Sequence, residues 1–439
     1  MISRTKPTLF FTLFESQLIR SYLDSDTGTF FQSITSQYKL VVITSPSLLD
    51  FIMNRLLNLN VHADVVAVDL KFYRESRVAK MVGFYLRWND KSPTTRRKIH
   101  ADFLSGTNSL TNHIFRLTLH YAIPKFPFVL NLLRQIYAHS IDLRNLWPEI
   151  QNLNDFERST VFVSSLTNYW EDVPCGAYLK SLGCRVVGSV RSWDNLVSHG
   201  QIKFIPDVFL SHSKFMTDSA IKDQCMKSNK VFQWMTPTYR SQFLPEQKVK
   251  NSSARHVIYA CMGISVNPDD LNFVQKLIEF STLLPSDLTI TFLEHPKFDS
   301  NLEGVKLPKN IRRKSFPYES SSLIDYYNFL NSADLLICGG TTAALDSCFL
   351  GIKVAIVGYE IASQNYWISG LRYLDMAPHT SLLFKRAGLQ IIKSDRELLA
   401  ILRGTMEISN YISSQVSNFT GDSDTDFIGI FINALKHDF

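Results

Sequence analysis

The chain has 439 residues, of which 45% are hydrophobic and 20% charged, and its net charge is +6. These values are typical of a soluble globular protein with two domains of ordinary size. No window reaches the roughly 18 apolar residues of a membrane span and no secretory signal is present, so we expect a cytoplasmic protein. The six cysteines show neither a CxxC pair nor a Cys/His ligand spacing, which predicts free thiols in a reducing compartment.

Short apolar strands alternate with helical stretches along the first half of the chain. A mostly helical insert is predicted over residues 91–152, where Pro124 and Pro127 interrupt helices. This alternation favours a parallel sheet with helices on both faces, in an N-terminal domain of residues 1–240. The expected strands are Thr8–Leu13, Leu40–Thr44, Val65–Val68, Thr160–Ser164, Arg185–Ser189 and Val208–Leu210, with helices such as Glu15–Leu23 and Ser47–Leu57 between them.

The same alternation returns in the second half, after a polar stretch from Tyr239 to Arg255 that reads as a linker. We expect a second doubly wound domain over residues 255–420. Residues 421–439 are predicted to form a last helix that braces the joint between the domains. The expected strands are Val257–Cys261, Leu288–Leu293, Leu335–Cys338 and Val354–Val357, and the expected helices are Asp269–Phe280, Ser321–Asn331, Thr341–Leu350 and Arg396–Arg403.

Positive charge is concentrated between Lys71 and Asn145, a segment with 13 Lys and Arg against 4 Asp and Glu. Aromatic residues lie among these charges. One interpretation is an ordinary solvated face of a helical domain. Another is contact with an anionic membrane surface. A nucleic-acid partner is not expected, because no nucleic-acid-binding motif is present.

The segment Asp334–Leu345 carries the clearest chemical signal in the chain. It predicts a buried strand over Leu335–Cys338, a turn at Gly339 and Gly340, and a helix that opens on Thr341 and Thr342. Glycine permits positive φ and close approach of the backbone to a ligand. The N-terminus of a helix offers unpaired N–H groups and partial positive charge, and the two hydroxyls can add hydrogen bonds. The pattern therefore predicts a phosphate or diphosphate site.

A second signal is the string Phe292–Lys297, in which Glu294, His295, Pro296 and Lys297 follow a predicted strand. Ligands of open α/β sheets bind outside the carboxyl ends of strands. His295 can donate a hydrogen bond to a phosphate oxygen, and Pro296 fixes the backbone beside it. The alternative is a structural hydrogen bond made by a histidine at a strand end.

The order strand–His-Pro followed by strand–Gly-Gly-Thr-Thr–helix resembles the donor half of GT-B glycosyltransferases. It is similar in style to bacterial sialyltransferases, polysialyltransferases and CDP-glycerol glycerophosphotransferases, over about residues 255–405. The resemblance implies that His295, Thr341 and Thr342 contact the phosphate of a nucleotide donor, and that Gly339 and Gly340 permit its approach. UDP-sugar transferases and UDP-GlcNAc 2-epimerases use related layouts, so the base of the nucleotide stays open. The resemblance also implies a reaction without metal or other cofactor.

In the sialyltransferases that the chain resembles, an acidic pair followed by glycine supplies the catalytic base. No such sequence occurs in this chain, so we expect the base from the N-terminal half. After the strand Arg185–Ser189 come Arg191, Trp193, Asp194 and Asn195. Trp193 can stack on a sugar, Asp194 with Asn195 can orient hydroxyls, and Asp194 can also accept the proton of an attacking hydroxyl. Arg191, Trp193 and Asn195 are the candidates for acceptor binding. Glu15, after the first strand, is the second candidate for the base. The alternative for this string is a helix cap with Trp193 in the core.

Three further positions follow predicted strands and are candidates for the same ligands. Gly263 follows Val257–Cys261 and either contacts phosphate or only makes the turn. Glu360 follows Val354–Val357, where the resemblance implies a carboxylate on a donor hydroxyl. The string Tyr169, Trp170, Glu171 and Asp172 is a candidate for the lining of an acceptor site.

Together these features predict two Rossmann-like doubly wound α/β domains facing a cleft, the GT-B arrangement, with a helical insert in the first. The implied activity is glycosyl transfer from a CMP- or CDP-linked donor, or otherwise a UDP-linked one, to a saccharide or lipid-linked saccharide in bacterial surface polysaccharide synthesis. Two alternatives stay open. One is an enzyme similar to UDP-sugar 2-epimerases, and the other is a non-catalytic binding subunit with a transferase fold.

Overall fold

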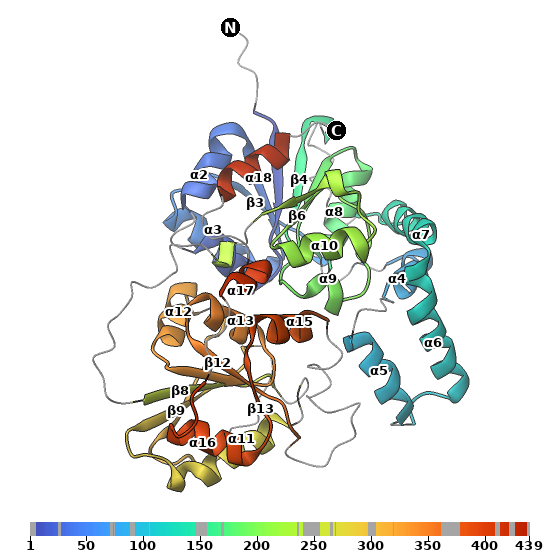
Figure 1. Ribbon diagram of the computed structural model, residues 1–439. Helices are drawn as coiled ribbons and strands as arrows, with labels where there is room; N and C mark the ends of the chain where they lie inside the picture. The colour runs from blue at the N-terminus through green and yellow to red at the C-terminus, as the bar shows by residue number, and fades with distance from the viewer. Residues whose placement is uncertain are drawn as a thin grey trace. The chain divides into compact units, whose positions relative to one another are not determined.

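The computed structural model describes residues 6–24, 28–70, 73, 75–87, 93–104, 106–144, 147, 156–167, 171–234, 237–239, 255–263, 267, 269–296, 304–318, 320–360, 378–408, 413–420 and 426–436. The chain divides into two compact units (Figure 1). The first unit combines Met1–Thr238 with Asp424–Phe439, and the second is Tyr239–Ser423. Each unit is built around one parallel sheet, and the two are described separately.

The first unit contains a seven-stranded sheet in the order β3-β2-β1-β4-β5-β6-β7. Every neighbouring pair is parallel. The chain moves outward from β1 to β3 and then returns to the other side of β1 at β4, which makes the β1/β4 junction the topological switch point. The strands are β1 (Thr8–Thr12), β2 (Lys39–Thr44), β3 (Asp64–Ala67), β4 (Thr160–Val163), β5 (Arg185–Gly188), β6 (Val208–Ser211) and β7 (Val231–Gln233).

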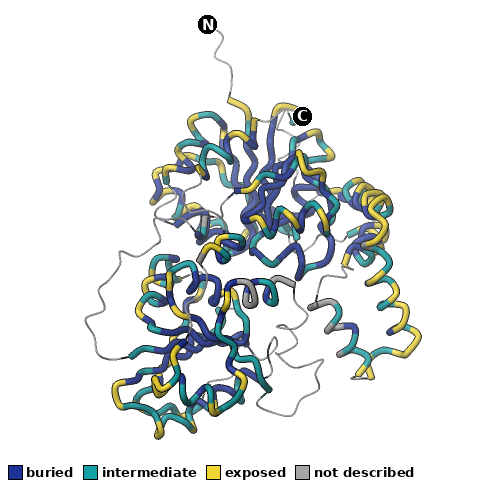
Figure 2. The backbone as a smooth tube through the Cα atoms, viewed as in Figure 1, coloured by how far each residue is buried: buried dark blue, intermediate teal, exposed yellow. Residues whose placement is uncertain are grey.

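Helices cover both faces of this sheet, because successive strand residues point to opposite faces and both faces are apolar. Phe10 contributes to the core under one set of helices, and its neighbour Phe11 contributes to the core on the other face. Figure 2 shows the strands as the most buried part of the unit. The helices are α1 (Ser16–Leu23), α2 (Gly28–Gln37), α3 (Leu49–Asn58), α4 (Arg77–Leu86), α5 (Pro93–Leu104), α6 (Leu110–Ala122), α7 (Pro127–His139), α8 (Asp172–Ser181), α9 (Asn195–Ser198), α10 (Lys214–Lys222) and α18 (Phe427–Lys436).

The last helix, α18, packs in the first unit although it follows the whole second unit in sequence. Arg185 donates hydrogen bonds to the carbonyl oxygens of Leu435 and Ala434, at 2.7 and 2.8 Å. Trp234 Nε1 donates to the Phe427 carbonyl at 2.9 Å. The two bonds from Arg185 satisfy carbonyl groups at the carboxyl end of the helix that have no partner within it, and the bond from Trp234 holds the first residue of the helix. The bracing role expected for this helix stays a prediction.

The second unit contains a six-stranded parallel sheet in the order β10-β9-β8-β11-β12-β13. Its switch point lies between β8 and β11. The strands are β8 (Arg255–Ala260), β9 (Leu288–Leu293), β10 (Ile311–Lys314), β11 (Leu335–Cys338), β12 (Lys353–Val357) and β13 (Gln390–Ile392). The helices are α11 (Asp270–Phe280), α12 (Leu323–Asn331), α13 (Thr342–Phe349), α15 (Pro378–Ala387), α16 (Asp395–Arg403) and α17 (Ser413–Thr420).

Two Rossmann-like parallel-sheet domains confirm the predicted fold class. Three short strands, β7, β10 and β13, were not expected from the sequence. Each is an edge strand of its sheet. Within the described part of the chain, no helix combines the length and the apolar character that crossing a membrane requires.

Candidate functional site

The register of the second sheet brings most of the predicted donor-binding residues to one edge. Leu293 of β9, Ala260 of β8, Cys338 of β11 and Ile356 of β12 form a single row across four neighbouring parallel strands. The loops that leave these strands therefore start at the same level. They carry the predicted residues His295, Gly263, Gly339, Gly340, Thr341, Thr342 and Glu360.

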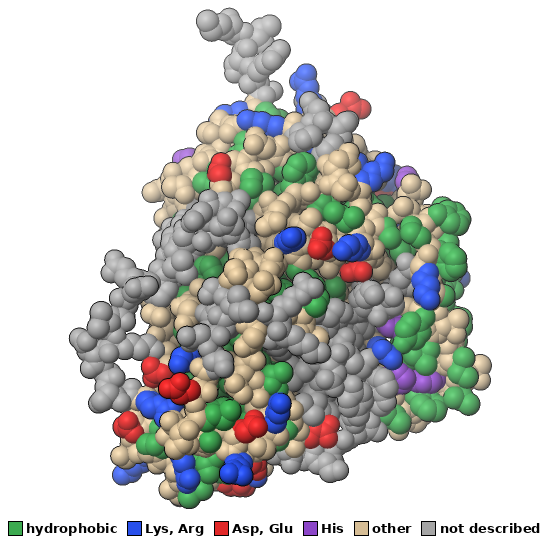
Figure 3. Space-filling model, viewed as in Figure 1, with side chains coloured by type: hydrophobic (Ala, Val, Ile, Leu, Met, Phe, Trp, Pro, Cys, Tyr) green, Lys and Arg blue, Asp and Glu red, His purple; other side chains and the backbone are tan. Residues whose placement is uncertain are grey.

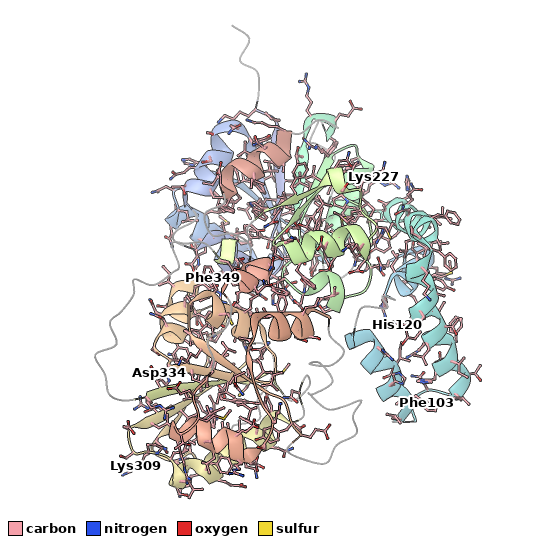
Figure 4. The ribbon with its side chains drawn as sticks, viewed as in Figure 1. Phe103, His120, Lys227, Lys309, Asp334 and Phe349 are labelled. Atoms are coloured by element: carbon pink, nitrogen blue, oxygen red, sulfur yellow. The ribbon has the colours of Figure 1, made fainter. Side chains whose placement is uncertain are left out.

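The amino ends of β8 and β11 are held together by two hydrogen bonds around Asp334, which Figure 4 labels. The backbone N–H of His256 donates to Asp334 Oδ2, and the N–H of Asp334 donates to the His256 carbonyl, both at 2.8 Å. These bonds fix the register of the two strands on either side of the switch point. Ligands of such sheets bind in the crevice at this point, beyond the carboxyl ends of the strands.

The turn between β11 and α13 has the geometry expected for close approach to a ligand. Gly340 has a φ of +114°, which favours glycine. A Cβ atom at Gly339 would lie 3.1 Å from Asn267 Nδ2 and from Met262 Sδ, so the neighbouring loop leaves little space for a side chain. Thr341 precedes the helix with φ −87° and ψ 167°, and its side chain does not cap the helix. Thr342, the first helical residue, is exposed.

The Thr341 hydroxyl is buried and has no oxygen or nitrogen partner among the described residues. The neighbouring group is the thiol of Cys338. Burial raises the pKa of this thiol, while the N–H groups of Thr341 and Gly340 and the Thr341 hydroxyl partly oppose the increase. The thiol of Cys338 is therefore the group that these N–H groups and the Thr341 hydroxyl face in the described structure.

The loop after β8 is fixed by the buried carboxylate of Asp270, the first residue of α11. Asp270 accepts hydrogen bonds from the N–H groups of Met262 and Gly263, at 2.5 and 2.9 Å, and from the Tyr259 hydroxyl at 2.5 Å. Burial raises the pKa of Asp270. Gly263 has a φ of +81°, as the turn requires. Because its N–H already has a partner, a phosphate contact by Gly263 stays a prediction.

The other predicted donor residues are half-buried at the same sheet edge. His295 lies two residues beyond β9, and the N–H of Glu294 beside it donates to the Lys314 carbonyl at 2.9 Å. Glu360 lies three residues beyond β12 and follows Tyr359, whose hydroxyl donates to Asp395 at 2.8 Å. Lys297, which was grouped with His295, lies outside the described residues.

The first unit has its own polar cluster at the β1/β4 switch point. Asp172 Oδ1 accepts hydrogen bonds from the hydroxyls of Thr12, at the end of β1, and of Ser164, just after β4. The N–H of Ser164 donates to Thr12 Oγ1 at 3.2 Å. The cluster joins the two strands where their loops diverge, and all three residues are fully buried.

The second carboxylate oxygen of Asp172 is buried and has no hydrogen-bond partner in the described part of the chain. Burial raises the pKa of Asp172 to about 7; the bonds from Thr12 and Ser164 oppose this rise, and the charge of Glu15 adds to it. A carboxyl group that titrates near neutrality can hold or release a proton at cellular pH. From the sequence, Asp172 was predicted only as part of the string Tyr169–Asp172, a candidate for the lining of an acceptor site. Its raised pKa could not be predicted, because burial and the nearby charge of Glu15 arise from the fold and have no sequence motif. Tyr169 and Trp170 of that string lie outside the described residues.

Glu15 and Arg191 are brought together from distant parts of the sequence. Arg191 Nη1 donates to Glu15 Oε2 at 2.5 Å, and both side chains are largely buried. Glu15 follows β1 and occupies the N-cap position of α1, yet its side chain does not cap that helix. The carboxylate is therefore oriented by Arg191, which comes from the loop after β5, and it lies close to the switch point.

The remaining candidates lie in the loop and short helix that follow Arg191. Asn195 is buried, and its Oδ1 accepts a hydrogen bond from the N–H of Ser192 at 3.0 Å. Trp193 is 4% exposed, which fits a packing role and leaves sugar stacking a prediction. Asp194 is half-buried at the N-cap position of α9 and lies 3.4 Å from the amide nitrogen of Asn195. The side chain of Asn195 therefore helps to fix this loop through its hydrogen bond with the backbone of Ser192.

Comparison with solved structures finds similarities of fold to an epimerase, to a protein bound to UDP and to a glycosyltransferase. A structure described as a UDP-N-acetylglucosamine 2-epimerase from Listeria monocytogenes has a TM-score of 0.52 and 9% identity, covering 98% of this chain and 96% of its own. MnaA of S. aureus with UDP has a TM-score of 0.51 and 7% identity, covering 98% and 96%. A glycosyltransferase of kitacinnamycin has a TM-score of 0.48 and 10% identity, covering 98% and 100%.

The first two similarities show the fold, and at such low identity they show the fold alone. No family model matches the sequence, and no curated protein matches it. The solved neighbours include UDP-sugar epimerases and glycosyltransferases, whereas a specific similarity to sialyltransferases or CDP-glycerol transferases is not among these findings.

Proposed function

We propose that this chain is a glycosyltransferase that uses a nucleotide-activated sugar. The observation that supports this most directly is the row Leu293–Ala260–Cys338–Ile356, which places the His295, Gly263, Gly339–Thr342 and Glu360 loops at one sheet edge. This edge contains the switch point of the second sheet, where nucleotides bind in folds of this kind.

The diphosphate would bind at the start of α13. The N–H groups that open α13 beyond Thr341 and the exposed hydroxyl of Thr342 would donate hydrogen bonds to phosphate oxygens, and His295 would donate from the neighbouring loop. These groups would stabilise the negative charge that develops on the departing nucleotide, a contribution that is usually large. Glu360 would accept a hydrogen bond from a donor hydroxyl.

The first unit would supply the acceptor site and the base. We now place Glu15 ahead of Asp194 as the base, because Glu15 lies at the switch point and is oriented by Arg191, while Asp194 lies beyond it on the α9 loop. The base would take the proton of the attacking sugar hydroxyl. Arg191 and Asn195, with Trp193, stay the proposed acceptor contacts. The donor would be cytidine-linked or UDP-linked, and the acceptor a saccharide or a lipid-linked saccharide of bacterial surface polysaccharide synthesis.

A second candidate function is epimerisation of a UDP-sugar, because the two best-scoring solved structures described above include a UDP-N-acetylglucosamine 2-epimerase and a complex with UDP. The two functions differ in their need for an acceptor. Incubation of the pure chain with UDP-N-acetylglucosamine alone, followed by NMR of the sugar, distinguishes them. Inversion at carbon 2 without acceptor would favour the epimerase and contradict glycosyl transfer.

The nucleotide site is tested by thermal unfolding with CMP, CDP, UDP, GDP, ADP and TDP. We expect one of these nucleotides to raise the melting temperature, since a ligand that binds only the native state stabilises it by RT ln(1 + [L]/Kd). Replacing Thr342 by Val removes one hydroxyl donor and should weaken binding about fivefold to twentyfold.

The matched control is Thr282→Val, because Thr282 is also exposed but follows α11 at the opposite edge of the same unit. Its nucleotide affinity should equal that of the unmodified chain. A shift with CMP or CDP alone would support a cytidine-linked donor, and a shift with UDP would support a UDP-sugar. Absence of any shift, or equal loss in both variants, would contradict the proposed site.

A further inference from the structure

The helices α4, α6 and α7 of the first unit expose an unusual number of large apolar side chains. Among the described residues, most of the large hydrophobic side chains that are exposed lie between Val78 and Ile136. Figure 3 shows hydrophobic side chains gathered over α6 and α7 at the right-hand edge of the view, and Figure 2 shows the same helices as exposed. We call this surface the insert face. It consists of Val78, Met81, Leu110, Ile114, Phe115, Tyr121, Phe126, Phe128, Leu132 and Ile136.

Helix α7 is apolar on two opposite sides. Leu130 and Tyr137 are fully buried in the core of the first unit. Phe128, Leu132 and Ile136 recur every four residues on the outer side and are 74%, 47% and 38% exposed. A helix that only covers a core keeps polar residues on its outer side. The outer stripe of α7 is therefore suited to a second apolar environment.

The apolar outer side continues beyond α7. The 3-10 turn Ile123–Lys125 joins α6 to α7, and Phe126, which follows it, is 56% exposed. Between α4 and α7 lies an open groove of about 510 Å³, whose lining includes Val78, Leu132 and Ile136. The groove brings exposed apolar residues of α4 and α7 to one surface, and its other lining residues are Ser76, Gln135, His139 and Ser140.

The charge on this face has one sign. The elements α4, α6, the turn Ile123–Lys125 and α7 contain no Asp or Glu. Arg77, Lys80 and Lys125 are exposed among the apolar residues. Carboxylates on adjoining described segments already have cationic partners. Asp102 pairs with Arg116 at 2.8 Å, Glu75 with Lys203 at 3.5 Å and Asp142 with Arg144 at 2.7 Å.

We propose that the insert face docks on an anionic lipid surface, with Phe126, Phe128 and Leu132 entering the interface and Arg77, Lys80 and Lys125 facing lipid phosphates. Exposed aromatic and aliphatic side chains combined with unopposed basic residues suit the boundary between headgroups and acyl chains. A second copy of the chain fits less well, because two such faces would bring like charges together. This inference is independent of the nucleotide site.

The test is flotation of the full chain with vesicles of phosphatidylcholine, with and without phosphatidylglycerol, at low and high salt. We expect binding only with phosphatidylglycerol and weaker binding as salt rises. The double variant Phe126→Ser/Phe128→Ser should reduce the bound fraction at least about tenfold. The charge variant Lys80→Glu/Lys125→Glu should have a similar effect.

Matched controls come from other helices of the same unit. Met53 and Leu57 on α3 are 52% and 73% exposed, close to the values for Phe126 and Phe128, so Met53→Ser/Leu57→Ser should bind like the unmodified chain. Lys214→Glu/Lys222→Glu on α10 is the charge control, because both lysines are exposed there.

Four outcomes would overturn the proposal. The first is no flotation of the unmodified chain, the second is equal binding to neutral vesicles, and the third is equal loss of binding in the control variants. The fourth is a dimer in solution that Phe126→Ser/Phe128→Ser converts to a monomer without any vesicle binding, which would assign the face to a second copy. Flotation requires no nucleotide or substrate, so its failure would leave the proposed transferase function standing.

Discussion

Glu15→Gln should lower the rate of sugar transfer by about 100-fold or more and leave nucleotide affinity unchanged. The amide can still accept the hydrogen bond from Arg191, so the side chain keeps its orientation, but it cannot take the proton of the attacking hydroxyl. Nucleotide affinity should persist because the predicted phosphate contacts all lie in the second unit. The thermal unfolding test identifies the nucleotide that the chain binds. The measurement is the rate at which that nucleotide is released from its sugar donor in the presence of acceptor.

Glu157→Gln is the matched control for this prediction. Glu157 is exposed and precedes β4, at the opposite edge of the same sheet, so its replacement should not change the rate. If Glu15→Gln is as active as the unmodified chain while Asp194→Asn is inactive, the base is Asp194 and not Glu15. If both variants keep full activity, neither carboxylate is the base.

Asp172→Asn should change how stability depends on pH. The pKa of Asp172 is near 7 in the folded chain and about 4 in the unfolded chain, so the folded state binds one proton more between these values. The free energy of unfolding of the native chain therefore falls as pH rises from about 4 to 7. Asparagine does not titrate, so this dependence is removed in the variant.

Relative to the native chain, the variant should gain up to about 4 kcal/mol between pH 4 and pH 8, since each pKa unit corresponds to about 1.4 kcal/mol. Urea unfolding of both proteins at several pH values measures this difference. A difference that is the same at pH 4 and pH 8 would show that Asp172 is ionised in the folded state. Asp207→Asn is a comparison at a partly exposed ion pair, that of Asp207 with Lys180, and should show a much smaller change.

Local sequence patterns predicted the central strands of both sheets closely. The strand Leu335–Cys338 and the helix that follows Thr341 are found where expected, because a buried run of apolar residues, two glycines and two threonines define them within a few positions. The edge strands β7, β10 and β13 were missed. They are three or four residues long, and β10 has the sequence Ile311–Lys314 with three exposed basic residues, so apolar patterning gives no signal there.

For the candidate site, local patterns along the chain were enough to predict which residue types follow each strand, and strand–helix alternation was enough to expect them at one sheet edge. The excess of basic residues in the helical insert could also be read from the sequence. Which of these side chains meet depends on the three-dimensional fold. The pairing of Glu15 with Arg191 joins residues 176 positions apart, and the cluster of Asp172 with Thr12 spans 160. Sheet order brings such distant residues together, and burial then shifts the pKa values of their side chains. Patterns in the sequence report only neighbours along the chain, so they contain neither effect.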